Sequence, residues 1–360
     1  MLLPTTYAVT IAVLVLCTLC WGTWANTLKK SRWRFELYYI DFAIGAVLAG
    51  VIAAYTVGSM GSDISVQDNF LLSGKKQVIF AFIAGCVINL AIMLMVAATD
   101  LAGMSVAVPI IMGLALIVGA IWNYVMTQTG SIAALVGGIL LVIGAVVVAA
   151  LAKAKIEGIR SEMATAAKLL EAAPVESIVV GKKKKVVEVA GPGPLRGVWL
   201  AIAGGFLMGA FYPLVGLCTE GELGLTNPYA VTLIFSVGML ASTFIYNLYF
   251  MNLPVKGLPT SFFAYFTGTL KQHFEGMLGG ALWIVGTGAL FAGLAAQGEA
   301  KVPSSIGYGF GYGAGLIAIL WGLLVWKEFA NADGGVKRLL GMMTVLLAVG
   351  IVLVAIAPQL

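Results

Sequence analysis

The chain has 360 residues, of which 61% are hydrophobic and only 10% are charged. Soluble domains carry about 25% charged residues, and a soluble protein of this length has no means of burying so much apolar surface. The composition excludes an ordinary soluble protein and favours a polytopic membrane protein. The net charge of +5 is interpreted as a signal of membrane topology, so we expect no nucleic-acid partner.

Ten apolar segments are long enough to cross a bilayer, whose core requires about 20 apolar residues per helix. The first segment lacks a preceding basic region and is interpreted as a retained span instead of a signal peptide. The predicted fold class is an all-α polytopic membrane protein with ten transmembrane helices. The expected spans are 7–26, 38–58, 77–98, 104–126, 132–152, 197–217, 226–249, 275–297, 303–326 and 338–357.

Lys and Arg residues crowd into alternate loops between these segments. Eighteen of the 21 fall in odd-numbered loops, and only Lys75, Lys76 and Lys301 fall in even-numbered ones. Cytoplasmic loops carry the excess of Lys and Arg, so we expect the odd-numbered loops in the cytoplasm and both termini outside. The expected location is the inner (cytoplasmic) membrane or the plasma membrane, with the lipid bilayer as a partner.

Two stretches between the segments are polar or mixed. Residues 153–196 form a basic linker that contains the lysine cluster 182–185, and we interpret it as cytoplasmic and in contact with anionic headgroups. The linker divides the chain into a first half, 1–152, and a second half, 197–360. A shorter stretch, Ser261 to His273, alternates aromatic and polar residues and is expected to form an interfacial helix.

The two halves share a layout of five segments each. The acidic residue and proline at Asp100 and Pro109 recur at Glu299 and Pro303 after the corresponding segment of the second half. Because five is odd, the second half enters the membrane from the opposite face. The pattern predicts two inverted five-helix repeats, an architecture common among secondary transporters.

The sequence contains few residues that could form a catalytic site or a metal site. Its four cysteines and its single histidine, His273, do not form a metal-ligating pattern. Cys17 and Cys20 lie one turn apart inside the first segment and are interpreted as packing residues. No pair of acids faces another at mid-depth, which argues against an intramembrane enzyme. We therefore expect no catalytic residues, no metal and no cofactor.

Several motifs carry a resemblance to a known family. They are the runs 20–26 (CWGTWAN) and 33–41 (WRFELYYID), and in the second half 265–273, 279–283 and 308–329. These runs resemble the ureide permease family and its bacterial relatives, the glucose/rhamnose-type sugar porters. The resemblance implies the fold of the drug/metabolite transporter superfamily, with ten helices in two inverted repeats around a central cavity. Plant members of the family are associated with allantoin and other ureides or nucleobases.

Candidate site residues are amides, hydroxyls and rings that fall at depths reachable from both sides. No buried Arg or Lys is available to hold an anion, and no deep carboxylate is available to hold a cation. We therefore expect a small neutral polar substrate, and a sugar and a ureide or nucleobase both fit. An efflux-type exporter is the alternative, and the oligomeric state stays open. The predicted substrate-binding residues are Asn89, Trp283, Tyr312, Trp21, Tyr212, Thr287 and Tyr308.

An ionisable residue inside a span is a functional candidate. Asp41 lies one turn inside the second segment, near the headgroups, where a carboxylate can pair with Arg32, Arg34 or Lys271. If transport is coupled to protons, Asp41 is the first candidate for the titrating group. A facilitator without ion coupling is the alternative.

Overall fold

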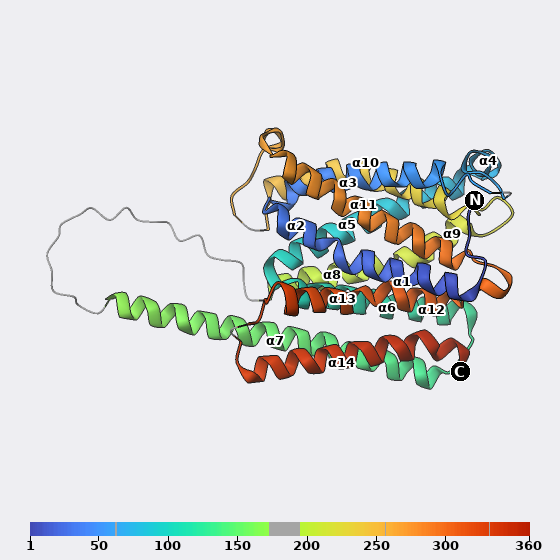
Figure 1. Cartoon of the computed structure of the whole chain (residues 1–360). Helices are drawn as coiled ribbons and strands as arrows, with labels where there is room; N and C mark the ends of the chain where they lie inside the picture. Colours follow the sequence, from blue (N-terminus) through green and yellow to red (C-terminus); the bar gives the residue numbers. More distant parts are fainter. Residues whose placement is uncertain (62, 173–194, 256, 331) are drawn as a thin grey trace.

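The computed structural model describes residues 1–61, 63–172, 195–255, 257–330 and 332–360. Every element in these residues is a helix, and ten helical spans among them are long and apolar enough to cross a membrane. The predicted all-α fold with ten spans is confirmed. The helices form an elongated bundle with both chain termini at one end, which we call the termini end (Figure 1). The last turns of α7 project beyond the opposite end, which we call the linker end.

Each half of the chain contributes five spans in chain order. The first five are α1–α2 (Tyr7–Thr23 and Ala25–Ser31), α3 (Phe35–Tyr55), α5 (Lys75–Ala102), α6 (Met104–Thr127) and α7 (Ile132–Ala172). The second five are α8–α9 (Arg196–Gly209 and Phe211–Thr219), α10 (Pro228–Asn252), α11 (Leu270–Leu294), α12–α13–η3 (Ser304–Tyr312, Ala314–Leu320 and Trp321–Val325) and α14 (Gly334–Ile356). Short helices complete the fold: α4 (Val66–Leu72), η1 (Phe262–Thr267), η2 (Gly298–Ala300) and η4 (Ala357–Gln359).

Two helix boundaries differ from the prediction for local reasons. Helix α7 runs to Ala172, well past the expected end at 152, because strong helix formers without a proline continue the turn. Helix α11 begins at Leu270, since Thr269 and Gln272 form a capping box there. The expected interfacial helix is therefore reduced to the 3₁₀-helix η1. The lysine cluster 182–185 lies outside the described residues.

Spans from the two halves pack in a reciprocal pattern. Helix α3 packs along α11, and α10, which comes five spans after α3, packs along α5. In the same way α1 packs on α11, and α8 packs on α5. Helices α7 and α14, the last span of each half, lie side by side (Figure 1). Exchanging each span for the one five places away maps each of these contacts onto another of them or onto itself.

Glycines set the close approach at two of these crossings. A Cβ atom on Gly45 or Gly280 would overlap a backbone carbonyl oxygen across the α3–α11 contact, and one on Gly85 or Gly238 would do so across the α5–α10 contact. Each of the four is the eleventh residue of its helix. Small residues allow membrane helices to pack backbone against backbone. The two crossings therefore use the same device at the same position.

Candidate functional site

Two cavities open toward opposite ends of the bundle. Each has a size typical of small-molecule sites. The cavity at the termini end has a volume of about 880 Å³ and includes Trp122, Asn123, Glu220, Val231, Phe291 and Tyr308 in its lining. The cavity at the linker end has a volume of about 600 Å³ and includes Lys29, Arg32, Glu36, Asp100, Lys153 and Glu328.

Three aromatic rings form a nearly parallel stack at mid-depth. The ring of Trp283 on α11 lies 5.6 Å from that of Trp21 on α1, at an interplanar angle of 10°. The ring of Phe235 on α10 also stacks on that of Trp283, at 5.9 Å and 8°. The Trp21 Nε1–H donates to the Trp283 carbonyl oxygen at 3.1 Å and to Thr287 Oγ1 at 3.3 Å. Trp21, Trp283 and Thr287, three of the predicted site residues, thus lie together.

The indole nitrogen of Trp283 is left without a partner in this stack. Trp283 is 1% exposed, and its buried Nε1 has no hydrogen-bond partner among the described residues. Buried Trp N–H groups usually find an acceptor, because an unsatisfied buried donor costs about 1–3 kcal/mol. The buried stack therefore combines three aromatic rings with one donor that has no partner among the described residues, and these groups suit a neutral solute with an acceptor atom.

Aromatic contacts connect the stack to the termini-end cavity. Phe291 lies two turns further along α11 and lines that cavity. Its ring meets Phe235 edge-on at 6.3 Å and stacks on Phe211 of α9 at 5.8 Å. The prediction did not include these phenylalanines, because nothing in their local sequence distinguishes them from ordinary core residues. The contacts among these phenylalanines are set by the packing of α9, α10 and α11.

Asn89 is fully buried and forms a polar junction between three spans. Its Nδ2 donates to the carbonyl of Met239 (3.0 Å) and to the hydroxyls of Ser242 (2.8 Å) and Thr243 (3.1 Å) on α10. Its Oδ1 accepts a hydrogen bond from the Tyr39 hydroxyl of α3 at 2.8 Å. An amide has two donor hydrogens and one oxygen, so these contacts occupy the side chain. In this structure Asn89 joins α3, α5 and α10.

None of the three predicted tyrosines is placed in the stack: two lie elsewhere, and the side chain of the third is outside the described part of the structure. Tyr308 and Tyr312 line a small cavity of about 30 Å³ that also includes Asn123. Tyr308 lines the termini-end cavity as well. Tyr212 belongs to α9, and its side chain lies outside the described part of the structure. Of the three, Tyr308 is the one placed on a route to the central stack.

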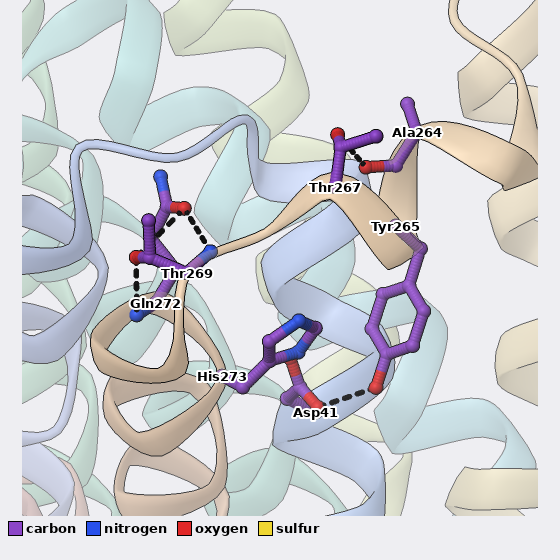
Figure 2. A network of polar contacts seen from close by, with 7 residues as sticks. All are labelled: Asp41, Ala264, Tyr265, Thr267, Thr269, Gln272 and His273. Carbon is purple, nitrogen blue, oxygen red and sulfur yellow. Dashed lines mark hydrogen bonds and ion pairs between the residues drawn. The ribbon is translucent and has the colours of Figure 1, made fainter.

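Asp41 is held by two side chains near the linker end (Figure 2). Its carboxylate accepts a hydrogen bond from the Tyr265 hydroxyl at 2.6 Å and meets His273 Nδ1 at 2.7 Å. The ring of Trp33 covers both partners, at 5.9 Å from Tyr265 and 4.9 Å from His273. Burial, followed by the hydrogen bond to Asp41, raises the pKa of the Tyr265 hydroxyl. The hydroxyl therefore remains a donor to Asp41.

The partners of Asp41 differ from the basic residues expected from the sequence. Arg34 pairs with Glu36 at 3.1 Å, and the side chain opposite Asp41 is His273. The reason is the early start of α11 at Leu270, which places His273 inside the first turn of that helix and against α3. The prediction chose basic residues because they are close to Asp41 in the sequence or at the same end of the span. The packing of α11 on α3 determines the actual partner.

Known proteins are similar to this chain over most of its length. The family model described as Ureide permease matches residues 151–357, more than half of the chain. Ureide permease 2 of Arabidopsis thaliana is 25% identical over 365 residues, which cover 90% of each protein. Ureide permease 1 of the same plant is 24% identical over 378 residues, which cover 95% of each. The resemblance indicated by the sequence motifs is confirmed: the chain belongs to the ureide permease family of multi-pass membrane transporters.

Proposed function

We propose that this protein is a secondary transporter that moves a small neutral polar metabolite by alternating access, with the central aromatic stack as its substrate site. The observation that carries the proposal is the buried Nε1–H of Trp283, which has no hydrogen-bond partner among the described residues and belongs to a ring stacked on those of Trp21 and Phe235. A flat solute satisfies this donor with a carbonyl or hydroxyl oxygen and rests its face on the rings. Thr287 adds a hydroxyl beside them.

The class of solute follows from the absence of charge at the stack. Trp21, Trp283, Phe235 and Thr287 are all uncharged, and a charged solute held by them alone would lose its hydration without compensation. The names of the Arabidopsis relatives make ureides the first class to test. Nucleobases share the flat amide edge of ureides, and a sugar has a C–H face that also stacks on indole. Both classes belong on the same panel.

Alternating access is supported by the arrangement of cavities and spans. One cavity opens at each end, and ring separations of 5.6 and 5.9 Å leave no room for a solute to pass through the stack. The reciprocal packing of the halves is the pattern that an inverted repeat produces. We place 1–152 and 197–360 as the two repeats and 153–196 as the linker between them. The excess of Lys and Arg in the odd-numbered loops supports a cytoplasmic linker end.

For proton coupling we propose Asp41 as the titrating group. The ionisable groups that face it are His273 and Tyr265, and Tyr38 and Glu275 lie close by on α3 and α11. Glu275 Oε2 is also buried without a hydrogen-bond partner among the described residues. Protonation of Asp41 removes the charge that attracts His273, and so loosens the contact between α3 and α11 at the linker end.

Uptake into proteoliposomes tests the proposed function. The panel comprises labelled allantoin, uracil, glucose, rhamnose and ribose, each at two pH gradients. We expect saturable uptake of one class, and a gradient dependence that is lost in Asp41→Asn. If no solute moves while the protein is folded and inserted, the neutral-metabolite assignment is wrong. Uptake that ignores the gradient in the wild type identifies a facilitator, and transport only out of loaded vesicles identifies an exporter.

A further inference from the structure

A cluster of hydrogen bonds at the linker end joins the first, fourth and ninth spans, and the proposed substrate site makes no use of it. The carboxylate of Glu328, which follows η3, accepts hydrogen bonds from the backbone N–H groups of Met104 (2.9 Å) and Ser105 (3.0 Å). It also accepts hydrogen bonds from the hydroxyl of Ser105 and from the ammonium group of Lys29. The Glu328 side chain is 12% exposed. One carboxylate therefore binds the start of α6 and the end of α2 together.

A second set of contacts extends this cluster along the first span. Trp321 Nε1 donates to Thr23 Oγ1 at 3.1 Å, and Trp326 Nε1 donates to Asn26 Oδ1 at 2.5 Å. The ammonium of Lys29 lies 5.1 Å above the centre of the Trp326 ring. Thr23 is the last residue of α1, and Asn26 and Lys29 lie three residues apart on α2, where they are neighbours on the helix surface. The linker-end part of span nine is thus fastened along one side of span one.

Both fastened segments are short pieces set off from the rest of their spans. Trp24 separates the seven-residue α2 from α1, and the chain of span nine changes to the π-helix η3 at Trp321–Val325. Single-turn π-helical segments occur frequently at functional sites. Each piece therefore begins where the regular α-helix of its span is interrupted. The side chains between them therefore decide whether the linker end is held closed.

The termini end shows the corresponding elements in a different relation. Exchange of the halves maps α2 onto α9 and the linker-end part of span nine onto the last turns of α6. Those two counterparts line the cavity of about 880 Å³, through Pro213 and Glu220 of the α9 region and Trp122 and Met126 of α6. The elements joined through Glu328 border the linker-end cavity of about 600 Å³, and their counterparts border the larger cavity at the termini end. The polar cluster around Glu328 is thus the feature that sets the linker end apart.

We propose that Glu328 is the linker-end gate residue of the transport cycle. Bound to Lys29 and to the start of α6, it keeps the central stack closed to the linker-end cavity, and its release opens that path. A carboxylate suits this role because it forms charge-assisted hydrogen bonds and is stabilised by the positive end of a helix dipole. Glu328 lines the linker-end cavity, so water reaches it as it leaves. The inference rests on the proposed transport function, and Glu328 is a positioning residue.

A purely structural role for Glu328 is the competing explanation. Helix α6 begins after Gly103, whose φ is +89° and which has no side chain to cap the helix. Glu328 supplies the missing acceptor. A cap alone would affect stability and leave access to the interior unchanged. The test must therefore measure access.

The decisive experiment measures the alkylation rate of a cysteine behind the gate. Ala25→Cys is introduced after the four native cysteines have been replaced by alanine, because residue 25 is 8% exposed and lies one turn deeper than Lys29 on the same helix face. A water-soluble maleimide is the probe. We expect Glu328→Ala to raise the labelling rate about tenfold or more, since it removes charge-assisted hydrogen bonds. Lys29→Met is expected to raise it by a smaller factor.

The matched control is Asp333→Asn. It breaks an ion pair at the same end, between Lys155 and Asp333 at 2.7 Å, in which both side chains are exposed. We expect its labelling rate to equal that of the parent. Equal rates for Glu328→Ala and the parent, in protein that unfolds cooperatively on heating, would overturn the gate and leave only a helix cap.

Two further arms keep the result decisive. If Glu328→Ala does not fold, Glu328→Gln and Lys29→Met are measured in the same assay, and unchanged labelling in both overturns the proposal. Labelling needs no solute, so it is independent of the uptake panel. Faster labelling of the variants without uptake of any solute by the wild type contradicts the transport function, whereas uptake with unchanged labelling contradicts the gate alone.

Discussion

The indole rings of Trp21 and Trp283 lie 5.6 Å apart and nearly parallel, although 262 residues separate them in the chain. The contact joins the first span to the eighth, and Phe235 adds the seventh. Spans from both halves therefore meet at one buried indole N–H, for which the described part of the chain supplies no acceptor. A movement of any of these spans changes the surroundings of that donor. A solute bound at the stack would therefore respond to the relative positions of the three spans.

Replacement of Trp283 by phenylalanine tests the donor. Trp283→Phe keeps an aromatic face and removes the Nε1–H, so we expect solute affinity to fall about three- to tenfold, the worth of one hydrogen bond. Affinity is measured by calorimetry or by KM with the solute that the uptake panel identifies. The control is Trp199→Phe, since Trp199 is 67% exposed on α8. Equal affinity in the two variants would show that the Trp283 Nε1–H does not bind the solute.

Asn89 is expected to matter for stability more than for affinity. Asn89→Ala leaves the buried Tyr39 hydroxyl without its acceptor, which costs about 1–3 kcal/mol of unfolding free energy. Thermal denaturation in detergent measures the loss. Asn252→Ala is the control, because Asn252 is exposed and bonds only within α10. A raised KM for Asn89→Ala at unchanged stability would instead place Asn89 in contact with the solute.

The α3–α11 crossing is expected to tolerate no side chain at Gly280. A Cβ atom there overlaps the carbonyl oxygen of Phe42, so Gly280→Ala should destabilise the protein by about 1–3 kcal/mol, as other overpacked interiors are. Gly341→Ala is the control, because a Cβ on Gly341 in α14 has no atom within 4 Å. The melting temperatures of both variants are compared with that of the wild type. A melting temperature for Gly280→Ala equal to that of Gly341→Ala would show that the crossing is loosely packed.

The Glu328 cluster predicts a stability difference that depends on pH. Burial alone would raise the pKa of Glu328, but the hydrogen bonds from Lys29 and Ser105 outweigh it and lower the pKa below its usual 4.5. A carboxyl group with a lowered pKa stabilises the folded state fully above the unfolded value and loses this contribution as the pH falls. We therefore expect the wild type to exceed Glu328→Gln in stability above pH 4.5, by about 1.5–3 kcal/mol.

That difference should shrink as the pH is lowered below 4.5. Melting temperatures of the two proteins between pH 7 and pH 3.5 check the prediction. Asp333→Asn serves as the reference, since Asp333 is exposed and its pKa is lowered mainly by the hydrogen bond from Lys155. A wild-type advantage that is constant over the whole range would show that the charge of Glu328 has no part in the closure.

The sequence determined the spans because their physics is local. A bilayer requires a fixed length of apolar residues, and in lipid each backbone group must be satisfied within its own helix. Nine span starts consequently fall within a few residues of the prediction, and α11 begins five residues early, at Leu270 instead of 275. The family resemblance was also visible in the sequence, since its motifs surround the first, eighth and ninth spans.

The partners of the polar side chains were decided only by the tertiary structure. Asn89 is occupied by α3 and α10, Asp41 is held by His273, and the Trp283 Nε1–H has no partner among the described residues. Depth follows from position along a helix, but the partner depends on the rotation of each helix and on which helix packs against it. Glu328 shows the same point, because its acceptor role exists only where α6 begins beside span nine.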